Sequence, residues 1–166
     1  IEEEEEGFRV SSSWSRTARR LDEEFGVSVG VVNGKRCLGG MLELLVHCHY
    51  LVAVDGARLG MPEITLPVMP GMEGCHWPFR KTSSKNWPKL VKLLLSGQSV
   101  PAKGATGWLI DYAGPMDKIL KKAWKTATGS GHGLKLRKVS KGALKAIPKE
   151  VRGLPDFGNP DIVASR

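Results

Sequence analysis

The chain has 166 residues, of which 41% are hydrophobic and 25% are charged, and its formal net charge is +8. This length is enough for one domain with a buried core. No apolar stretch reaches the roughly 18–20 residues that a membrane-spanning helix requires, and no segment follows a signal-peptide pattern, so we expect no membrane partner. The three cysteines are odd in number and lack framework spacing, which favours a reducing compartment: the cytoplasm, or the mitochondrial matrix in a eukaryote.

The first third of the chain predicts an acidic tail, a helix, a strand and a second helix. Glu2–Glu6 is a run of five glutamates that is typical of a disordered acidic tail or linker, and a helix is expected from about Val10 to Phe25. The β-branched run Val27–Val32 predicts a buried strand that ends at the turn pair Asn33 and Gly34. From Gly39 to Cys48 the sequence is apolar on nearly every side, which is typical of a helix inside a domain.

Short strands follow, and helices dominate the second half. Tyr50–Val54 reads as a buried strand and Arg58–Met61 as a short one, after which Pro62 blocks a helix and places Glu63 on a tight turn. The later expectations are helices at Trp77–Lys81, Trp87–Leu95, Pro101–Gly107 and Asp117–Thr128, a strand at Trp108–Ile110, a flexible break at Gly129–Gly133 and an irregular tail from Leu154.

The most specific feature is the pair Gly39 and Gly40 at the start of the apolar helix. A helix N-terminus has free N–H groups and the positive end of the helix dipole, and glycines let a ligand oxygen approach the backbone closely. Such a terminus can serve as half of an oxyanion hole. Glu43 follows one turn later, and a lone ionisable residue in an apolar helix is costly unless it is paired or functional. Two carboxyls in one desolvated pocket, here Glu43 and Glu63, tend to adopt different pKa values.

These residues carry a resemblance to a known family. The run NGKRCLGGMLEL…HYLVA…ARLGMPEITLPVMPGMEG resembles the crotonase pattern NGxAxGGGxEL…CDxxxA…AxFGxPEIxLGxxPGxGG, the pattern of the enoyl-CoA hydratase/isomerase superfamily. The similarity extends from about Val27 to Arg80, with a weaker continuation at Ser96–Tyr112. The resemblance implies an α/β fold, a partial ββα superhelix of the crotonase type with C-terminal helices. The expected parts are an acidic tail and helix at 1–26, a crotonase-like core at 27–112 and a C-terminal helical segment and tail at 113–166.

The resemblance also implies an activity and a site. The family adds water across the 2,3 double bond of an enoyl-CoA thioester and needs no metal or other cofactor for it. Glu43 and Glu63 occupy the two catalytic glutamate positions, with Glu43 as base toward water and Glu63 as proton donor to carbon. Gly40 occupies the second oxyanion-hole position. The substrate site is expected to include Gly39, Met41, Pro62 and Gly71. The partners implied are an acyl-CoA substrate and further copies of the chain, as a homotrimer or hexamer.

Several positions depart from the family pattern. Met41 stands where the family has the third Gly of GGG, His49 replaces an Asp, Glu73 replaces the second Gly of PGxGG, and His76 replaces a Gln. The family's first oxyanion N–H comes from a loop with an A-x-x-D-like motif, and no such loop precedes Val27. We therefore expect the chain to represent the C-terminal two-thirds of a crotonase domain, with a missing N-terminal half or a fused domain as a further partner.

Other interpretations stay open. An enoyl-CoA isomerase is a close neighbour, and a catalytically silent acyl-CoA-binding or assembly module is the alternative from another class. Residues 80–166 hold 18 Lys+Arg against 5 Asp+Glu, which suits the phosphates of coenzyme A but is also the electrostatic footprint of nucleic-acid binding, the less favoured reading. His47, Cys48, His49, Cys75 and His76 fit no zinc-finger spacing, so no metal site is expected. The five tryptophans are expected to be packing anchors and not a stacking platform for bases.

Overall fold

A strand–strand–helix unit repeats along the chain in the computed structural model, which describes residues 4–66, 68–131, 133–140 and 142. The first unit comprises β1 (Val29–Val32), β2 (Arg36–Leu38) and α2 (Gly40–Val46), and the second begins with β3 (Tyr50–Val54) and β4 (Arg58–Gly60). β1 pairs in parallel with β3, and β2 pairs in parallel with β4. Each unit therefore adds one strand to each of two sheets, which is the expected ββα superhelix.

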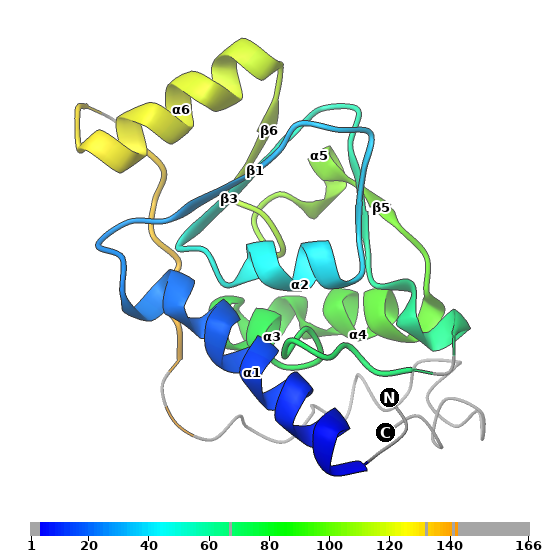
Figure 1. The fold of residues 1–166 in the computed structure, drawn as a ribbon. Helices are drawn as coiled ribbons and strands as arrows, with labels where there is room; N and C mark the ends of the chain where they lie inside the picture. The colour runs from blue at the N-terminus through cyan, green and yellow to red at the C-terminus, as the bar shows by residue number, and fades with distance from the viewer. Residues whose placement is uncertain (1–3, 67, 132, 141, 143–166) are drawn as a thin grey trace.

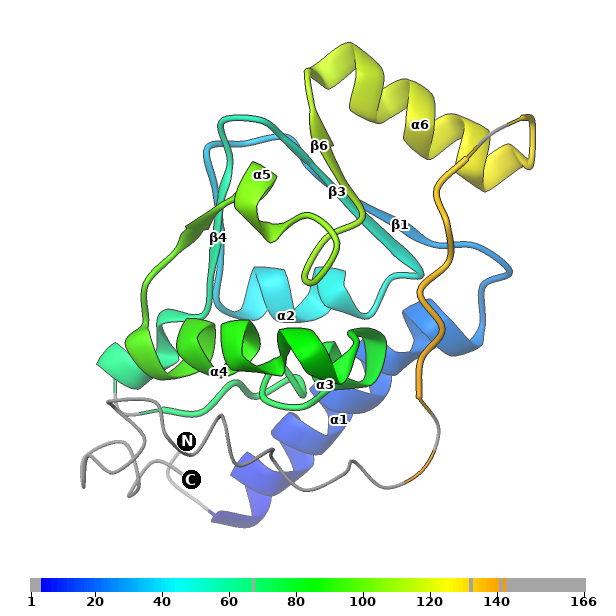
Figure 2. The same cartoon turned by 180° about the vertical axis from the view of Figure 1, so that it is seen from behind.

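Two later strands complete both sheets, with a helix between them. β5 (Val100–Pro101) joins the second sheet antiparallel to β4, and β6 (Tyr112–Gly114) joins the first sheet parallel to β3, giving the orders β1-β3-β6 and β2-β4-β5. The sheets converge at one end, and α5 (Ala102–Ala105) lies between them (Figures 1 and 2). Across the open end lie α2 and α4 (Trp87–Ser96). α2 thus packs against strands of both sheets.

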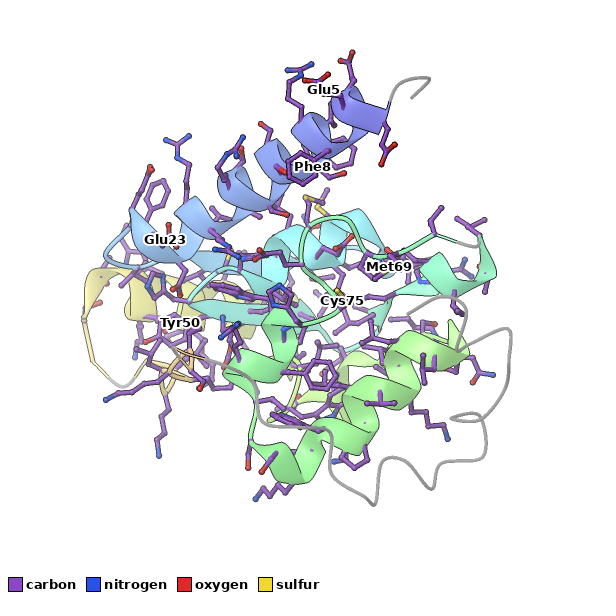
Figure 3. All side chains as sticks on the ribbon, turned by 90° about the horizontal axis from the view of Figure 1, so that it is seen from below. Glu5, Phe8, Glu23, Tyr50, Met69 and Cys75 are labelled. Carbon is purple, nitrogen blue, oxygen red and sulfur yellow. The ribbon has the colours of Figure 1, made fainter. Side chains whose placement is uncertain are left out.

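The acidic N-terminal run is helical where the structure describes it, which corrects the prediction of a disordered tail. α1 spans Glu4–Glu23, and Glu4, Glu5 and Glu6 form its first turn. Carboxylates at a helix N-terminus interact favourably with the positive end of the dipole, so the run extends the helix instead of preceding it. Figure 3 shows Glu5 and Phe8 on the end of α1 that extends beyond the rest of the described fold.

Most predicted elements are confirmed, but Glu63 lies in a short 3-10 helix that Pro62 begins, where a tight turn was predicted, and one strand is misplaced. Trp108–Ile110 is a turn, and the strand lies at Tyr112–Gly114 instead. The short strand β2 was not predicted, because its three residues have no strand pattern in the sequence; it forms by pairing with β4. The remaining helices are η1 (Pro62–Thr65), α3 (Trp77–Lys81), η2 (Ser84–Asn86) and α6 (Met116–Thr128). The three-part division at residues 26 and 112 stays a prediction, and the tail from Leu154 lies outside the described residues. Within the described ranges, no helix is long and apolar enough to cross a membrane.

The tryptophans divide between core and surface. Trp77, Trp87 and Trp108 are buried as predicted. Trp14 on α1 and Trp124 on α6 are 52% and 69% exposed, so these two lie at the surface and not in the core.

α2 is fixed at its C-terminal end by a buried lysine. The Lys81 side chain comes from α3, is 6% exposed, and donates to the carbonyls of Val46 at 3.2 Å and of Cys48 and His49. Burial lowers the pKa of Lys81 to about 8. The last carbonyls of a helix lack partners within the helix, so this amine satisfies groups that would otherwise be buried unpaired. Together with the fully buried Leu42, it fixes α2 in the core.

Candidate active site

The N-terminal end of α2 has the close backbone approach expected of an oxyanion-binding turn. Gly39 caps the helix with φ 55° and ψ −137°, a conformation that favours glycine. A Cβ built on Gly39 would lie 3.0 Å from Oε1 of Glu63, so the carboxyl of Glu63 packs directly against this backbone. The N–H of Gly39 donates to the carbonyl of Gly60 at 2.9 Å and is therefore already paired.

Gly40 is the first residue of α2, so its N–H has no partner within the helix. A Cβ on Gly40 would lie 3.1 Å from Cε of Met72, whose side chain covers this position. Met41 is 59% exposed, so the expectation of a helix buried on every side is wrong at this residue. Pro62 begins η1, and Gly71 is exposed in the loop that follows. The roles of these residues in substrate binding stay predictions.

Glu43 is buried and held by backbone N–H groups. Its side chain is 3% exposed, and Oε2 accepts hydrogen bonds from the N–H of Met72 at 2.8 Å and of Gly74 at 3.0 Å. An ionised carboxylate only accepts hydrogen bonds, so two converging donors suit that form. The backbone of residues 72–74 therefore fixes the direction of the Glu43 carboxyl.

Glu63 is in a different environment. It is 9% exposed, and its Oε2 is buried without a hydrogen-bond partner among the described residues. Burial raises the pKa of the Glu63 carboxyl above its ordinary value; its own backbone N–H acts in the opposite direction, and the nearby charge of Glu43 raises the pKa further. A carboxyl that keeps its proton more readily than usual suits a general acid. The two glutamates therefore differ as an acid and a base would.

The raised pKa of Glu63 predicts a pH-dependent stability. Between the ordinary carboxyl pKa of 4.5 and the raised value, the folded protein keeps a proton that the unfolded chain has lost. The free energy of unfolding therefore falls as pH rises through this window and levels off above it. Glu63→Gln removes the titration, so thermal unfolding from pH 4 to 8 should show the variant gaining on the unaltered chain across the window. Glu24→Gln, at an exposed residue in the turn that follows α1, is the control. A difference that does not change with pH contradicts the prediction.

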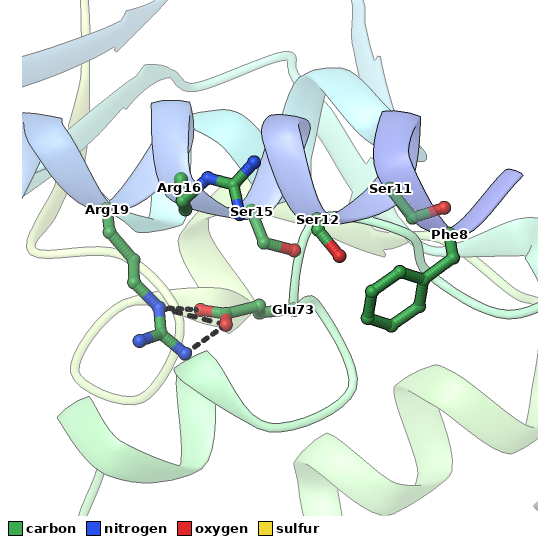
Figure 4. A pocket seen from close by; sticks show the side chains of 7 residues that line it. All are labelled: Phe8, Ser11, Ser12, Ser15, Arg16, Arg19 and Glu73. Atoms are coloured by element: carbon green, nitrogen blue, oxygen red, sulfur yellow. Dashed lines mark hydrogen bonds and ion pairs between the residues drawn. The ribbon is translucent and has the colours of Figure 1, made fainter. Parts of the chain in front are cut away.

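The contacts of the loop at 70–74 are the part of the site that the sequence did not identify. His47 packs on Trp77 with ring centroids 4.4 Å apart, and its Nε2 lies 2.8 Å from the carbonyl of Met72. Glu73 is held from α1 by Arg19, whose Nε lies 2.9 Å from each carboxylate oxygen (Figure 4). The PGxxG pattern marks the loop, but nothing in the sequence marks Arg19 as its partner.

The histidines and cysteines have other contacts. His47 contacts Trp77 and Met72, the Nδ1 of His49 lies 2.9 Å from Oγ of Ser28, and the three cysteines are free thiols. In the described part of the chain, no group of three or more His, Cys, Asp or Glu side chains could hold a metal ion.

Comparison with known proteins finds relatives that are named as hydratases. No family model matches the chain. A protein named probable enoyl-CoA hydratase in Mycobacterium bovis is 39% identical over 92 residues, which cover 55% of this chain and 35% of that protein. The 2,3-dehydroadipyl-CoA hydratase of Escherichia coli is 34% identical over 125 residues, which cover 75% of this chain and 45% of that protein. The chain thus spans less than half the length of these two relatives.

Solved structures agree in fold. The structure of an enoyl-CoA hydratase from Geobacillus kaustophilus matches with a TM-score of 0.67 at 17% identity, covering 76% of this chain and 47% of that one. At this identity the likeness concerns the fold alone, and the family follows from the sequence relatives together with that fold. The chain belongs to the crotonase superfamily, whose enoyl-CoA hydratases it resembles in sequence and in fold, and it contains part of the crotonase domain.

Proposed function

We propose that the chain carries the acid–base half of an enoyl-CoA hydratase site, with Glu43 and Glu63 as its catalytic residues. The observation that supports this most directly is the contrast between the two carboxyls at one end of α2. Glu43 accepts two backbone hydrogen bonds, whereas Glu63 is desolvated and its pKa is raised. Such a contrast is what a reaction that moves one proton from water and one proton to carbon requires.

In the proposed reaction, water adds across the 2,3 double bond of an enoyl-CoA thioester. Glu43 takes a proton from the water while the water oxygen bonds to C3, and Glu63 gives a proton to C2. Negative charge develops on the thioester oxygen between these events, and the N–H of Gly40 at the start of α2 stabilises it. The product is the 3-hydroxyacyl-CoA, and both carboxyls return to their first state when the proton on Glu43 passes to Glu63.

The first oxyanion donor, the partner of Gly40, is proposed to come from outside the described residues, because the N–H of Gly39 is already bonded to the carbonyl of Gly60. Loss of one such donor typically costs roughly 10²–10³-fold in rate. The isolated chain is therefore expected to be slow unless another segment or copy supplies the donor. Assembly as a trimer or hexamer, a cytoplasmic or matrix location and the absence of any cofactor remain parts of this proposal.

Two neighbouring functions are separated from this one by their products and by binding. An isomerase would shuttle a proton between C2 and C4 and so shift the double bond by one carbon, without taking up water. A silent module would bind a CoA thioester without turning it over, and the close contact of the Met72 side chain with Gly40 is compatible with that.

The test is hydration of crotonyl-CoA by the full chain, followed as loss of the enoyl absorbance, with binding of butyryl-CoA measured beside it by calorimetry. Hydration that depends on both glutamates supports the proposal. Binding without hydration favours the silent module, and the absence of both contradicts the proposed function.

A further inference from the structure

The loop that holds Glu43 contains a backbone conformation that its own residue does not favour. Glu73 has φ 68°, and it is the only non-glycine residue with positive φ in the described part of the chain. A residue with a side chain in the left-handed region is strained, and it keeps this conformation only where its surroundings hold it there. The family pattern has glycine at this position, so the strain belongs to this sequence.

This conformation has a visible consequence at the candidate site. It lies between Met72 and Gly74, whose N–H groups both donate to Oε2 of Glu43. Nearby N–H groups around a left-handed residue form a concave site for an anion, known as a nest. Here the anion is the Glu43 carboxylate. If Glu73 relaxed to negative φ, one of the two N–H groups would turn away from that carboxylate.

Arg19 is placed to prevent that relaxation. Its guanidinium, on α1, binds both carboxylate oxygens of Glu73, and the Glu73 side chain is only 10% exposed (Figure 4). The same face of α1 meets the loop again at Ser15, whose Oγ lies 3.4 Å from the carbonyl of Gly71. Two parallel contacts from a planar guanidinium fix the position and the orientation of the carboxylate.

We propose that Arg19 and Glu73 are positioning residues: their ion pair locks residues 72–74 in the conformation that aims the Glu43 carboxyl. This inference rests on the proposed function for the role of Glu43 and extends it to α1. The charges around the pair fit, because burial disfavours ionisation of Glu73 but the hydrogen bonds and charge of Arg19 outweigh it, so the pKa of Glu73 lies below its usual range. His76, with Nε2 3.8 Å from Oε1 of Glu73, is the other basic group facing it, alongside the more distant His47.

Amide hydrogen exchange of Met72 and Gly74, measured by NMR on the full chain, tests the lock without depending on catalysis. Arg19→Met should speed exchange at both amides by about tenfold, in the range of a local opening. Arg20→Met is the matched control, because Arg20 lies on the same helix and pairs with Glu24 instead. Glu73→Gly removes the backbone strain at residue 73 together with the ion pair to Arg19, so the amides of Met72 and Gly74 should stay protected in this variant. Adding Arg19→Met to Glu73→Gly should not change their exchange rates further.

Crotonyl-CoA hydration then tests positioning. Arg19→Met should lower kcat by about tenfold with little change in KM, because a displaced base slows the chemical step more than binding. Glu73→Gly should restore kcat in the Arg19→Met background. Unchanged amide exchange in Arg19→Met, or faster exchange with an unchanged kcat, would overturn the proposal. If the unaltered chain hydrates nothing, the proposed function fails by itself, and amide exchange alone decides whether Arg19 holds the loop around Glu43.

Discussion

Glu43→Gln and Glu63→Gln are each expected to lower kcat for crotonyl-CoA hydration by about 10²–10⁴-fold, the usual contribution of a positioned general acid or base. Glutamine keeps the size of the side chain, and its carbonyl oxygen can still accept the hydrogen bonds from Met72 and Gly74 that Oε2 of Glu43 accepts now. Binding of butyryl-CoA should therefore change little in either variant. The double variant should be only slightly slower than each single one, because residues that act as a unit are not additive.

A matched control separates the loss of a catalytic group from the mere loss of one negative charge. Glu24→Gln makes the same substitution at an exposed carboxylate that pairs with Arg20, and it should leave kcat unchanged. Glu43→Gln has a second expected effect, because the charge of Glu43 is one cause of the raised pKa of Glu63. Its loss should move the pH window of Glu63 toward ordinary carboxyl values. If Glu43→Gln retains the full rate, Glu43 is only a buried partner of the loop.

Local sequence patterns were sufficient where the structure depends on burial. The β-branched and apolar runs predicted β3 at Tyr50–Val54 with its observed bounds, and a helix through Trp77–Lys81 was predicted where α3 lies. Local patterns failed where the position of a strand depends on its pairing with a distant segment of the chain. The apolar residues Trp108–Ile110 fill a turn in the core, whereas the strand begins after Asp111, whose N–H donates to Leu51 and whose carboxylate accepts from the Leu51 N–H. Such reciprocal contacts between residues 60 positions apart leave no local pattern.

The candidate site divides in the same way. Gly39, Gly40, Glu43 and Glu63 could be predicted because their spacing follows a family motif, and the structure brings them to one end of α2. The surroundings that distinguish the carboxyls of Glu43 and Glu63 could not be predicted from the sequence. The donors to Glu43 lie 29 and 31 residues further along the chain, and Arg19 is 54 residues from Glu73. These contacts depend on how α1 and the loop pack, which no spacing rule encodes.

Gly74→Ala is the sharpest test of the cradle around Glu43. A Cβ at Gly74 would lie 2.7 Å from Cγ, 2.9 Å from Oε2 and 3.0 Å from Cδ of Glu43, so the buried side chain has to move. Overpacking of this kind costs about 1–3 kcal/mol of unfolding free energy. Displacement of the proposed base should also lower the hydration rate on the order of 10²-fold. Thermal unfolding and the crotonyl-CoA assay measure the two effects.

Two further variants test whether the loss of stability in Gly74→Ala comes from the contact between the new Cβ and the Glu43 side chain. Gly104→Ala makes the same change in α5, where the nearest atom to the new Cβ would be Cγ of Pro101 at 3.8 Å, and it should alter neither stability nor rate by much. Glu43→Ala removes the atoms that the added methyl group would strike, so Gly74→Ala should cost little stability in that background, the coupling expected of residues in contact. An equal loss of stability with and without Glu43 would mean that the glycine serves the backbone of the loop, and that Glu43 does not depend on it.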